Sequence, residues 1–348
     1  MTLSICLATW NSMKFIRECL ESIFSQTVFL DPDFEIKIAV NLVDNGSEDG
    51  TVEFIKNNYP QIHILKNMNN VGFCKSYNQA IKMHQTDWVL IMNVDTILAS
   101  DFLAVILKTA ERISDKIKAG SFGPKILKAE TVFEDSLPKI IKTNKIDSCG
   151  LMVKKSRLVK NIGEGEIDNS QYDNVQDFFG FSGACLLFRR EALEDIKIGA
   201  EYFDEDFFAY QDDFDLAWRL RLFGWQNIFV PGAKVYHFRA SRINTLKPWQ
   251  FLQIVRARRA KSLLINYHSY KNHFWVLVKN ELMANFWRHF PFIFWLELKK
   301  FIFILFFEQK TLASLKFFFK LLPKMLFKRK IIMARRKAAV EEINKFFV

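Results

Sequence analysis

The stretch WVLIMNVDT, residues 88–96, places an acid shortly after a strongly apolar run. Five consecutive apolar residues are typical of a strand that is buried on both faces. A buried carboxylate without a partner costs several kcal/mol, so Asp95 needs an explanation. Two explanations are open: Asp95 caps a helix that begins near Ser100 and Asp101, or it lies at the carboxyl end of the strand because a cation binds there.

Similar units precede this stretch. Apolar strands are expected at residues 3–8, 36–43 and 63–65, and each is followed by a segment with the period of an amphipathic helix. Such alternation predicts an α/β fold with a parallel, doubly wound sheet, in which ligands bind outside the carboxyl ends of the strands. Polar residues stand at three of these ends, and we expect a site there: Thr9-Trp10-Asn11, Asp44-Asn45 and Asn93-Val94-Asp95-Thr96.

The composition is that of a globular protein. Half of the 348 residues are hydrophobic and a quarter are charged, so we expect a packed core. The five cysteines are scattered without a CxxC pair, which argues against a disulfide framework or structural zinc and favours a reducing cytosol. The N-terminus lacks a basic stretch and indicates a first strand rather than a signal peptide.

The net charge of +11 is concentrated near the C-terminus. Residues 270–337 carry 15 Lys and Arg against three Glu. The apolar runs at 290–296 and 301–307 fall short of the ~20 residues that a spanning helix needs. Aromatic faces interspersed with lysines predict helices that lie in a membrane interface with anionic headgroups. The alternative is a helical packing or dimerisation region with solvated lysines.

The chain therefore divides into residues 1–245 and a basic, aromatic-rich helical region at 246–348. Within the first part, regular alternation stops near residue 126. Residues 161–177 are expected to form a loop, 178–188 a strand, 213–223 a helix and 235–238 a last short strand. We expect no nucleic-acid binding by the tail, because its aromatics fall on predicted helices and not on a stacking surface of a sheet.

Several ordered motifs in residues 2–240 resemble the glycosyltransferase family 2 enzymes of the GT-A fold, particularly their bacterial rhamnosyltransferase-like branch. These motifs are Leu7-Ala8-Thr9-Trp10-Asn11-Ser12, Val43-Asp44-Asn45-Gly46-Ser47, Asn70-Val71-Gly72-Phe73 with Asn78, Asn93-Val94-Asp95-Thr96, Phe181-Ser182-Gly183-Ala184, Phe203-Asp204-Glu205-Asp206-Phe207-Phe208, Tyr210-Gln211-Asp212-Asp213-Phe214-Asp215-Leu216 and His237. The resemblance implies an inverting transferase that moves a sugar from a nucleotide-sugar to a hydroxyl group of a cell-surface glycan.

The resemblance also implies a divalent cation, Mg²⁺ or Mn²⁺, which stabilises the leaving diphosphate. Asp95 matches the metal-binding end of the family's DxD-type motif, and Asn93 stands where the first acid would be. His237 matches a position that often supplies another ligand. Its alternative is a surface or core histidine beside a strand.

The resemblance also implies a site for the sugar donor. Asp44 matches the acid that reads the donor's base: a carboxylate accepts from the N3–H of uracil or thymine, so UDP- and dTDP-sugars both fit. Its alternative is a turn residue, since Asp-Asn-Gly-Ser is a good turn. The other residues expected to bind the donor are Thr9, Trp10, Asn11, Gly72, Asn78, Asn93 and Asp95.

Asp212-Asp213 matches the family's acidic pair on the acceptor side. Inverting transfer needs a base for the acceptor hydroxyl, and we assign that role to Asp213 with Asp212 in reserve. The alternative is acidic charge that complements a helix dipole.

The expected location is the cytoplasm, at the inner face of the cell membrane, with a lipid-linked glycan or glycolipid as acceptor. Homo-oligomers through the C-terminal region are a further expectation. The competing function is a catalytically inactive module that binds sugar nucleotides at the membrane surface.

Overall fold

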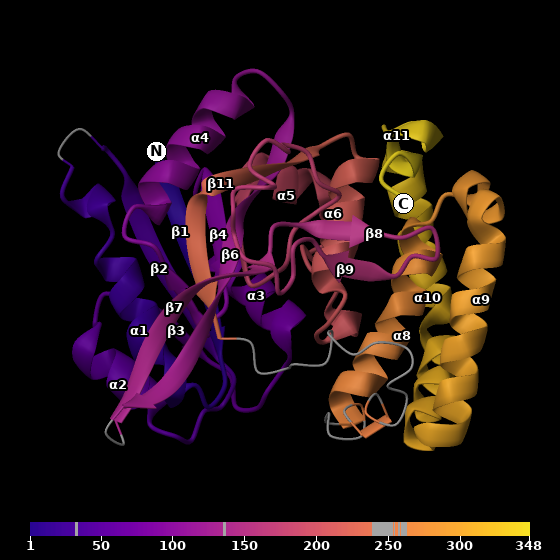
Figure 1. Ribbon diagram of the computed structural model, residues 1–348, viewed down its shortest axis with the longest axis horizontal. Helices are drawn as coiled ribbons and strands as arrows, with labels where there is room; N and C mark the ends of the chain where they lie inside the picture. The colour runs from indigo at the N-terminus through magenta and orange to yellow at the C-terminus, as the bar shows by residue number, and fades with distance from the viewer. Residues whose placement is uncertain (32–33, 135–136, 239–252, 254, 257, 259–262) are drawn as a thin grey trace.

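The computed structural model describes residues 1–348 apart from 32–33, 135–136, 239–252, 254, 257 and 259–262. A β-sheet with helices on both faces occupies one side of the molecule, and C-terminal helices stand beside it (Figure 1). The strands β1 (Thr2–Thr9), β2 (Lys37–Asp44), β3 (His63–Lys66) and β4 (Trp88–Met92) pair in parallel in the order β3-β2-β1-β4. The predicted alternation of parallel strands and helices in this part of the chain is confirmed.

Beyond β4 the sheet becomes mixed instead of remaining parallel. Strand β10 (Cys185–Arg189) runs antiparallel to both β4 and β6 (Ala119–Glu134). Strand β11 (Gln226–His237) is parallel to β6, and β5 (Thr96–Leu98) is antiparallel to β11. The last strand is therefore much longer than the predicted 235–238, and residues 178–184 precede a strand that begins only at Cys185.

Two hairpins were not predicted. Strand β6 pairs with β7 (Leu137–Ser148), and β8 (Leu151–Val153) pairs with β9 (Val159–Asn161). Strand β6 lies between β10 and β11, and its first half is buried, whereas residues 140–145 of β7 and the three residues of β9 are partly or fully exposed.

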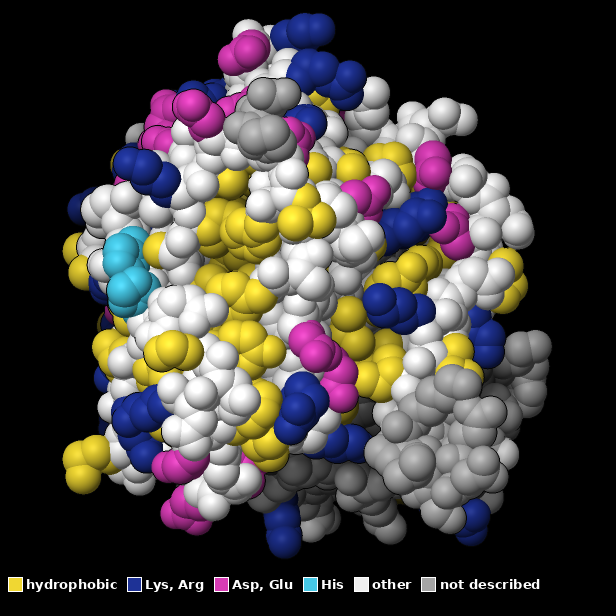
Figure 2. All heavy atoms as spheres, turned by 90° about the vertical axis from the view of Figure 1, so that its left-hand side faces the viewer, with side chains coloured by type: hydrophobic (Ala, Val, Ile, Leu, Met, Phe, Trp, Pro, Cys, Tyr) yellow, Lys and Arg dark blue, Asp and Glu magenta, His cyan; other side chains and the backbone are white. Residues whose placement is uncertain are grey.

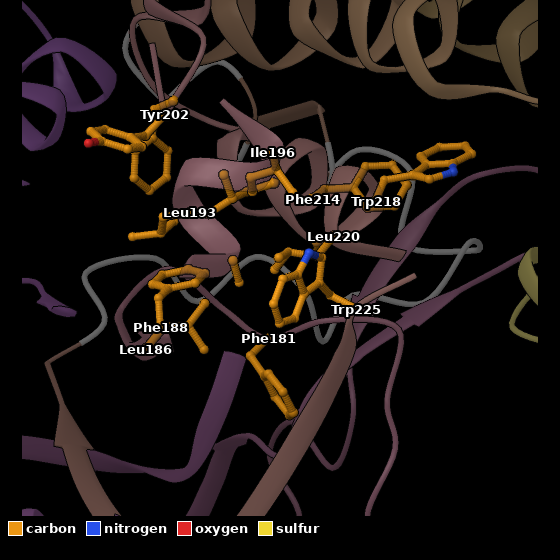
Figure 3. Close-up of a cluster of buried hydrophobic side chains, with 14 of the residues drawn as sticks. Phe181, Leu186, Phe188, Leu193, Ile196, Tyr202, Phe214, Trp218, Leu220 and Trp225 are labelled. Carbon is orange, nitrogen blue, oxygen red and sulfur yellow. The ribbon is translucent and has the colours of Figure 1, made fainter. Parts of the chain in front are cut away.

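The helices form two layers. One face of the sheet is covered by α1 (Met13–Phe24), α2 (Thr51–Asn58) and α4 (Phe102–Ser114), and the other by α3 (Phe73–Met83), α5 (Arg190–Ile196) and α6 (Asp212–Leu222). Successive residues of β1 serve opposite layers, as the strand period requires. Figure 3 shows the second layer, where side chains of β10, α5 and α6 converge around Phe188, Leu193 and Trp218. All five cysteines are buried and free.

The tail consists of α8 (Leu263–Asn280), α9 (Met283–Phe307), α10 (Ala313–Arg335) and α11 (Val340–Asn344). Figure 1 shows these helices at one end of the molecule, with α9 outermost. Buried tail residues, among them Trp275, Met325 and Phe347, belong to the same hydrophobic cluster as α6. The regions on either side of the expected boundary at residue 245 thus share one core. None of the helices among the described residues is long and apolar enough to span a bilayer.

Figure 2 shows the opposite end of the molecule, the left-hand side of Figure 1, which carries the N-terminal strands and helices. Acidic, basic and hydrophobic side chains are intermixed on this face. The excess positive charge of the chain therefore lies elsewhere, in agreement with its position in the sequence.

Candidate active site

The carboxyl ends of β1 and β2 lie side by side, because the strands pair in parallel with Thr9 opposite Asp44. Asp44 is fully buried, and its Oδ2 accepts hydrogen bonds of 3.1 Å from the backbone N–H groups of Gly46 and Ser47. This turn accounts for one carboxylate oxygen only. Asp44 Oδ1 and Thr9 Oγ1 are buried, and neither has a hydrogen-bond partner among the described residues. These two atoms lie at the same edge of the sheet, and a ligand that binds there would supply their missing hydrogen bonds.

The loop after Thr9 is joined to the loop after Asp44. The Oδ1 of Asn11 accepts a 2.9 Å hydrogen bond from the N–H of Glu48, and the N–H of Asn11 donates to Ser47 Oγ at 2.9 Å. Asn11 adopts a φ of 50°, which its short polar side chain tolerates. Trp10, beside it, leaves 56% of its surface exposed and presents a large ring at this edge.

Gly72 and Asn78 hold a neighbouring segment in place. Gly72 has a φ of +88°, and a Cβ at this position would come within 2.4 Å of the Phe208 ring. Asn78 Nδ2 donates to the carbonyl of Phe203 at 2.8 Å, and its Oδ1 accepts from the N–H groups of Tyr202 and Phe203. Both residues, expected at the donor, therefore anchor the segment that leads to the acidic pair.

Asp95 does not cap a helix. Strand β5 separates it from α4, whose N-cap residue is Asp101. The Asp95 side chain is 30% exposed, and its Oδ1 lies 3.4 Å from Nε2 of His237 at the end of β11. The backbone N–H of Phe238 donates to the carbonyl of Asp95 at 2.9 Å. The structure thus brings together the two residues expected to hold a metal, which are 142 positions apart in the sequence.

A third residue, Asp147 of β7, completes this cluster. Its Oδ2 accepts a hydrogen bond from Nδ1 of the buried His237 at 3.0 Å. Burial lowers the pKa of His237, but the hydrogen bonds to Asp147 and Asp95 outweigh it and raise the pKa to about 9. Asp147 was not predicted from the sequence, because no local motif marks it. Among the residues that the structure describes, no group of three or more His, Cys, Asp or Glu side chains forms a metal site.

The acidic pair begins α6. Asp213 Oδ2 accepts from the N–H of Gly183 at 3.2 Å, and its Oδ1 accepts from the N–H of Phe214 at 2.8 Å. The carbonyl of Ala184, the residue after Gly183, accepts from the N–H of Asn93 at 2.8 Å. The dipeptide Gly183-Ala184 therefore joins the end of β4 to Asp213.

Asp212 differs from its neighbour in its surroundings. It is buried, whereas Asp213 is partly exposed. Burial, followed by the charge of Asp213, raises the pKa of Asp212 to about 8. The two carboxyls of the pair thus stand in different environments.

Asp213 also lines a cavity. This cavity, of about 480 Å³, lies between the β8–β9 hairpin and the start of α6. It is lined by Leu151, Leu158, Val159, Lys160, Asn161, Glu164, Gln211, Asp213 and Phe214. A lining that combines apolar side chains with several polar groups is the usual make-up of a small-molecule site.

Comparison with known proteins gives two family matches. The model described as Glycosyl transferase family 2 matches residues 4–197, more than half of the chain. The model described as Glycosyl transferase family group 2 matches residues 164–325 and so extends into the tail helices.

Curated relatives include an N-acetylglucosaminyl-diphospho-decaprenol L-rhamnosyltransferase of Mycobacterium tuberculosis. It is 28% identical over 220 residues, which cover 59% of this chain and 68% of the relative. The abequosyltransferase RfbV of Salmonella typhimurium is 33% identical over 111 residues, covering 30% of this chain and 32% of the relative.

Among solved structures, GalNAc-T7 with UDP, GalNAc and Mn²⁺ resembles this chain with a TM-score of 0.55 and 14% sequence identity. The likeness covers 80% of this chain and 48%, about half, of the GalNAc-T7 chain. At this identity the likeness concerns the fold.

Proposed function

Since the chain belongs to glycosyl transferase family 2, we propose that it transfers a sugar, with inversion, from a UDP- or dTDP-sugar to a hydroxyl group of a lipid-linked cell-surface glycan. It is a glycosyltransferase of the GT-A fold. The observation that carries the donor half of the proposal is the pair of unpartnered buried atoms, Thr9 Oγ1 and Asp44 Oδ1. The acceptor half draws on the mycobacterial relative, whose name places its acceptor on a diphospho-decaprenol.

Asp44 would read the base of the donor. Its Oδ2 is engaged by the turn, and its Oδ1 is left to accept a hydrogen bond. The N3–H group of uracil or thymine supplies such a donor, whereas cytosine has none at that position. Leaving this oxygen unsatisfied in the bound state would carry a desolvation cost of about 1–3 kcal/mol, which is the size of the discrimination that we expect.

Asp95 and His237 would hold the divalent cation. The carboxylate and the imidazole are 3.4 Å apart, and Asp147 accepts the Nδ1–H, which directs Nε2 towards the site. Because the pKa of His237 is about 9, binding of the cation would displace the proton from Nε2. Two protein ligands suit Mg²⁺ or Mn²⁺, which keep waters and bind substrate phosphates, and the imidazole favours Mn²⁺. When bound, the cation would neutralise charge that develops on the diphosphate.

Asp213 would act as the base. As the acceptor oxygen attacks the anomeric carbon, the bond from that carbon to the diphosphate oxygen breaks. The hydroxyl proton passes to the Asp213 carboxylate, and the nucleoside diphosphate leaves. The 480 Å³ cavity beside Asp213 would offer the acceptor sugar apolar side chains and polar groups such as those of Asn161 and Gln211.

The test is a panel of UDP- and dTDP-sugars incubated with the protein and Mn²⁺ or Mg²⁺, followed by assay of released nucleoside diphosphate. We expect one donor class to be turned over and the Asp95→Ala variant to be inactive. Nucleotide binding without any turnover, by the wild type and with lipid-linked acceptors present, would instead favour the inactive binding module.

A second part of the proposal concerns where the enzyme works. Of the 24 large hydrophobic side chains that are exposed among the described residues, 14 lie on α9 and α10. They include Trp287 and Trp295, which are 64% and 57% exposed. Solitary exposed apolar residues are normal, but so dense a group indicates an interaction surface.

The charges around this surface favour an anionic bilayer as its occupant. Lys299, Lys310, Lys320 and Lys330 are exposed. Glu297 inside α9 is paired with Lys300, and Glu308 at the end of α9 is paired with Arg258. The described part of this surface therefore combines aromatic side chains and lysines and has no unpaired acid. Such a surface suits the interface of the inner leaflet, where the enzyme would meet a lipid-linked acceptor.

Flotation with vesicles that contain phosphatidylglycerol tests this surface. The full chain should float with them, and raising the salt should release only part of it, because aromatic burial persists when charges are screened. Trp287→Glu with Trp295→Glu should abolish flotation, whereas Leu30→Glu, at a site that is 83% exposed elsewhere, should not. Flotation that is unaffected by the double change, or a dimer that dissociates on making it, would refute the bilayer as occupant.

A further inference from the structure

The loop before the acidic pair has an unfavourable backbone. Phe208, Tyr210 and Gln211 have φ angles of 67°, 71° and 64°. Residues other than glycine rarely adopt a positive φ, and each one that does costs on the order of 1–3 kcal/mol of conformational free energy. A conformation of this kind persists only where its surroundings impose it, so the contacts of this loop decide the position of Asp212 and Asp213.

The tail helix α8 supplies these contacts. Asn272 is fully buried, and its Nδ2 lies 2.9, 2.8 and 2.8 Å from the carbonyl oxygens of Phe207, Ala209 and Tyr210. Three converging carbonyls fix the orientation of the amide, because its oxygen would be repelled there. The neighbouring Lys271 Nζ donates to the carbonyl of Asp206 at 2.9 Å.

Buried ion pairs hold both ends of the same segment. Before the loop, Asp204 lies between Lys279 of α8 and Lys328 of α10, each at 2.6 Å. The charges of the two lysines outweigh burial and hold the pKa of Asp204 well below its ordinary value. After the loop, Lys279 also pairs with Asp215 of α6 at 2.9 Å.

We infer that Asn272 is a positioning residue for glycosyl transfer: it holds the loop of residues 207–210 so that Asp213 faces the acceptor cavity. This inference rests on the proposed function of Asp213. The tail is then more than a docking element, because α8 and α10 shape the acceptor side of the active site. Loss of the amide should let the loop relax towards ordinary φ angles and displace α6 at its first turn.

The test compares Asn272→Leu with Asn285→Leu. Asn285 of α9 is also fully buried and donates to the carbonyl of Val340, away from the loop. Since a misplacement of about 1 Å can cost ~10²-fold in rate, we expect kcat of Asn272→Leu to fall 10- to 100-fold with donor KM within about threefold of wild type. Asn285→Leu should lose thermal stability but keep its kcat. Asn272→Gln, which retains the amide, should recover part of the rate.

Hydrogen exchange over residues 205–213 provides a readout that does not need turnover. Exchange should accelerate in Asn272→Leu and stay as in wild type in Asn285→Leu. Equal exchange in the two variants, equal kcat losses, or a loss confined to donor KM would overturn the inference. Wild-type protein that binds nucleotide but turns over no donor would count against the proposed function, while the exchange comparison still decides the role of Asn272. If Asn272→Leu does not fold, Lys271→Met, which removes the hydrogen bond to the carbonyl of Asp206, carries the same comparison.

Discussion

Replacing Asp212 by Asn should stabilise the protein, and the gain should increase with pH. Asp212 is buried at the start of α6, and burial with the charge of Asp213 raises its pKa from the ordinary 3.8 to about 8. Between these values the folded protein keeps a proton that the unfolded chain has released. The wild type therefore loses stability as pH rises from about 4 to about 8, whereas Asn, which resembles the protonated acid, does not titrate.

The size of the effect follows from the pKa shift. Each pH unit inside this window changes the free energy of unfolding by ~1.4 kcal/mol, so the advantage of Asp212→Asn should grow by ~3 kcal/mol between pH 5 and pH 7. Urea denaturation followed by tryptophan fluorescence at pH 5, 6 and 7, at constant ionic strength, measures this difference.

Asp195→Asn is the matched control. Burial raises the pKa of Asp195, but the hydrogen bond from Trp225 and the charge of Lys337, among others, outweigh it and lower the pKa. A carboxyl with a lowered pKa contributes its full stability above its unfolded value of about 4. The cost of Asp195→Asn should therefore be constant from pH 5 to pH 7.

A difference between wild type and Asp212→Asn that does not change over this range would refute the reasoning, because Asp212 would then be ionised in the folded protein. The result also bears on catalysis. A carboxyl that keeps its proton at neutral pH is a poor base, so the raised pKa of Asp212 supports our proposal that Asp213 takes this role.

Three further predictions concern the base, the donor site and the shared core. Asp213→Asn should lower kcat by ~10²–10⁴-fold while nucleotide titration shows unchanged donor affinity; an active variant would remove Asp213 from the mechanism. Asp44→Ala should raise donor KM with little change in kcat in steady-state assays, and a lowered kcat at unchanged KM would contradict base recognition. Phe347→Ala removes a buried ring 5.7 Å from Trp218 and should cost ~3–5 kcal/mol in urea denaturation, whereas a change below 1 kcal/mol would show that the C-terminus is not part of the core.

The parallel half of the sheet and the edge at which the candidate site lies were predictable, because short continuous stretches of the sequence indicate both. Each strand of that half except β3 is an apolar run followed directly by a polar end, and parallel pairing places those ends together. The cluster of Asp95, His237 and Asp147 was predictable only in part. Asp95 and His237 belong to motifs, but Asp147 comes from a hairpin strand whose polar and apolar residues alternate. Nothing near it in sequence indicates that this strand reaches the end of β11.

The composition of the tail did not show which of its lysines are buried and which are exposed. A helix with Lys and Phe suits both a membrane interface and a packed interior, and α10 has features of both: Lys328 is buried, while Phe319 and Phe327 are 69% and 63% exposed. Which lysine points inwards depends on acids more than a hundred residues earlier, beyond the reach of a periodicity argument.

One signal for this arrangement was nevertheless present in the sequence. Residues 201–215 contain seven acidic residues and no Lys or Arg, immediately around the expected base. So many acidic residues in one segment repel one another when ionised unless cations lie nearby, and the only large excess of cations in the sequence is in the tail. Charge segregation of this kind predicts contact between the two segments, and Lys279, Lys324 and Lys328 make it. The tail lysines thus fall into a set that pairs with the acidic segment and an exposed set that we propose contacts the membrane. Neutralising the first set should impair catalysis even where no membrane is present.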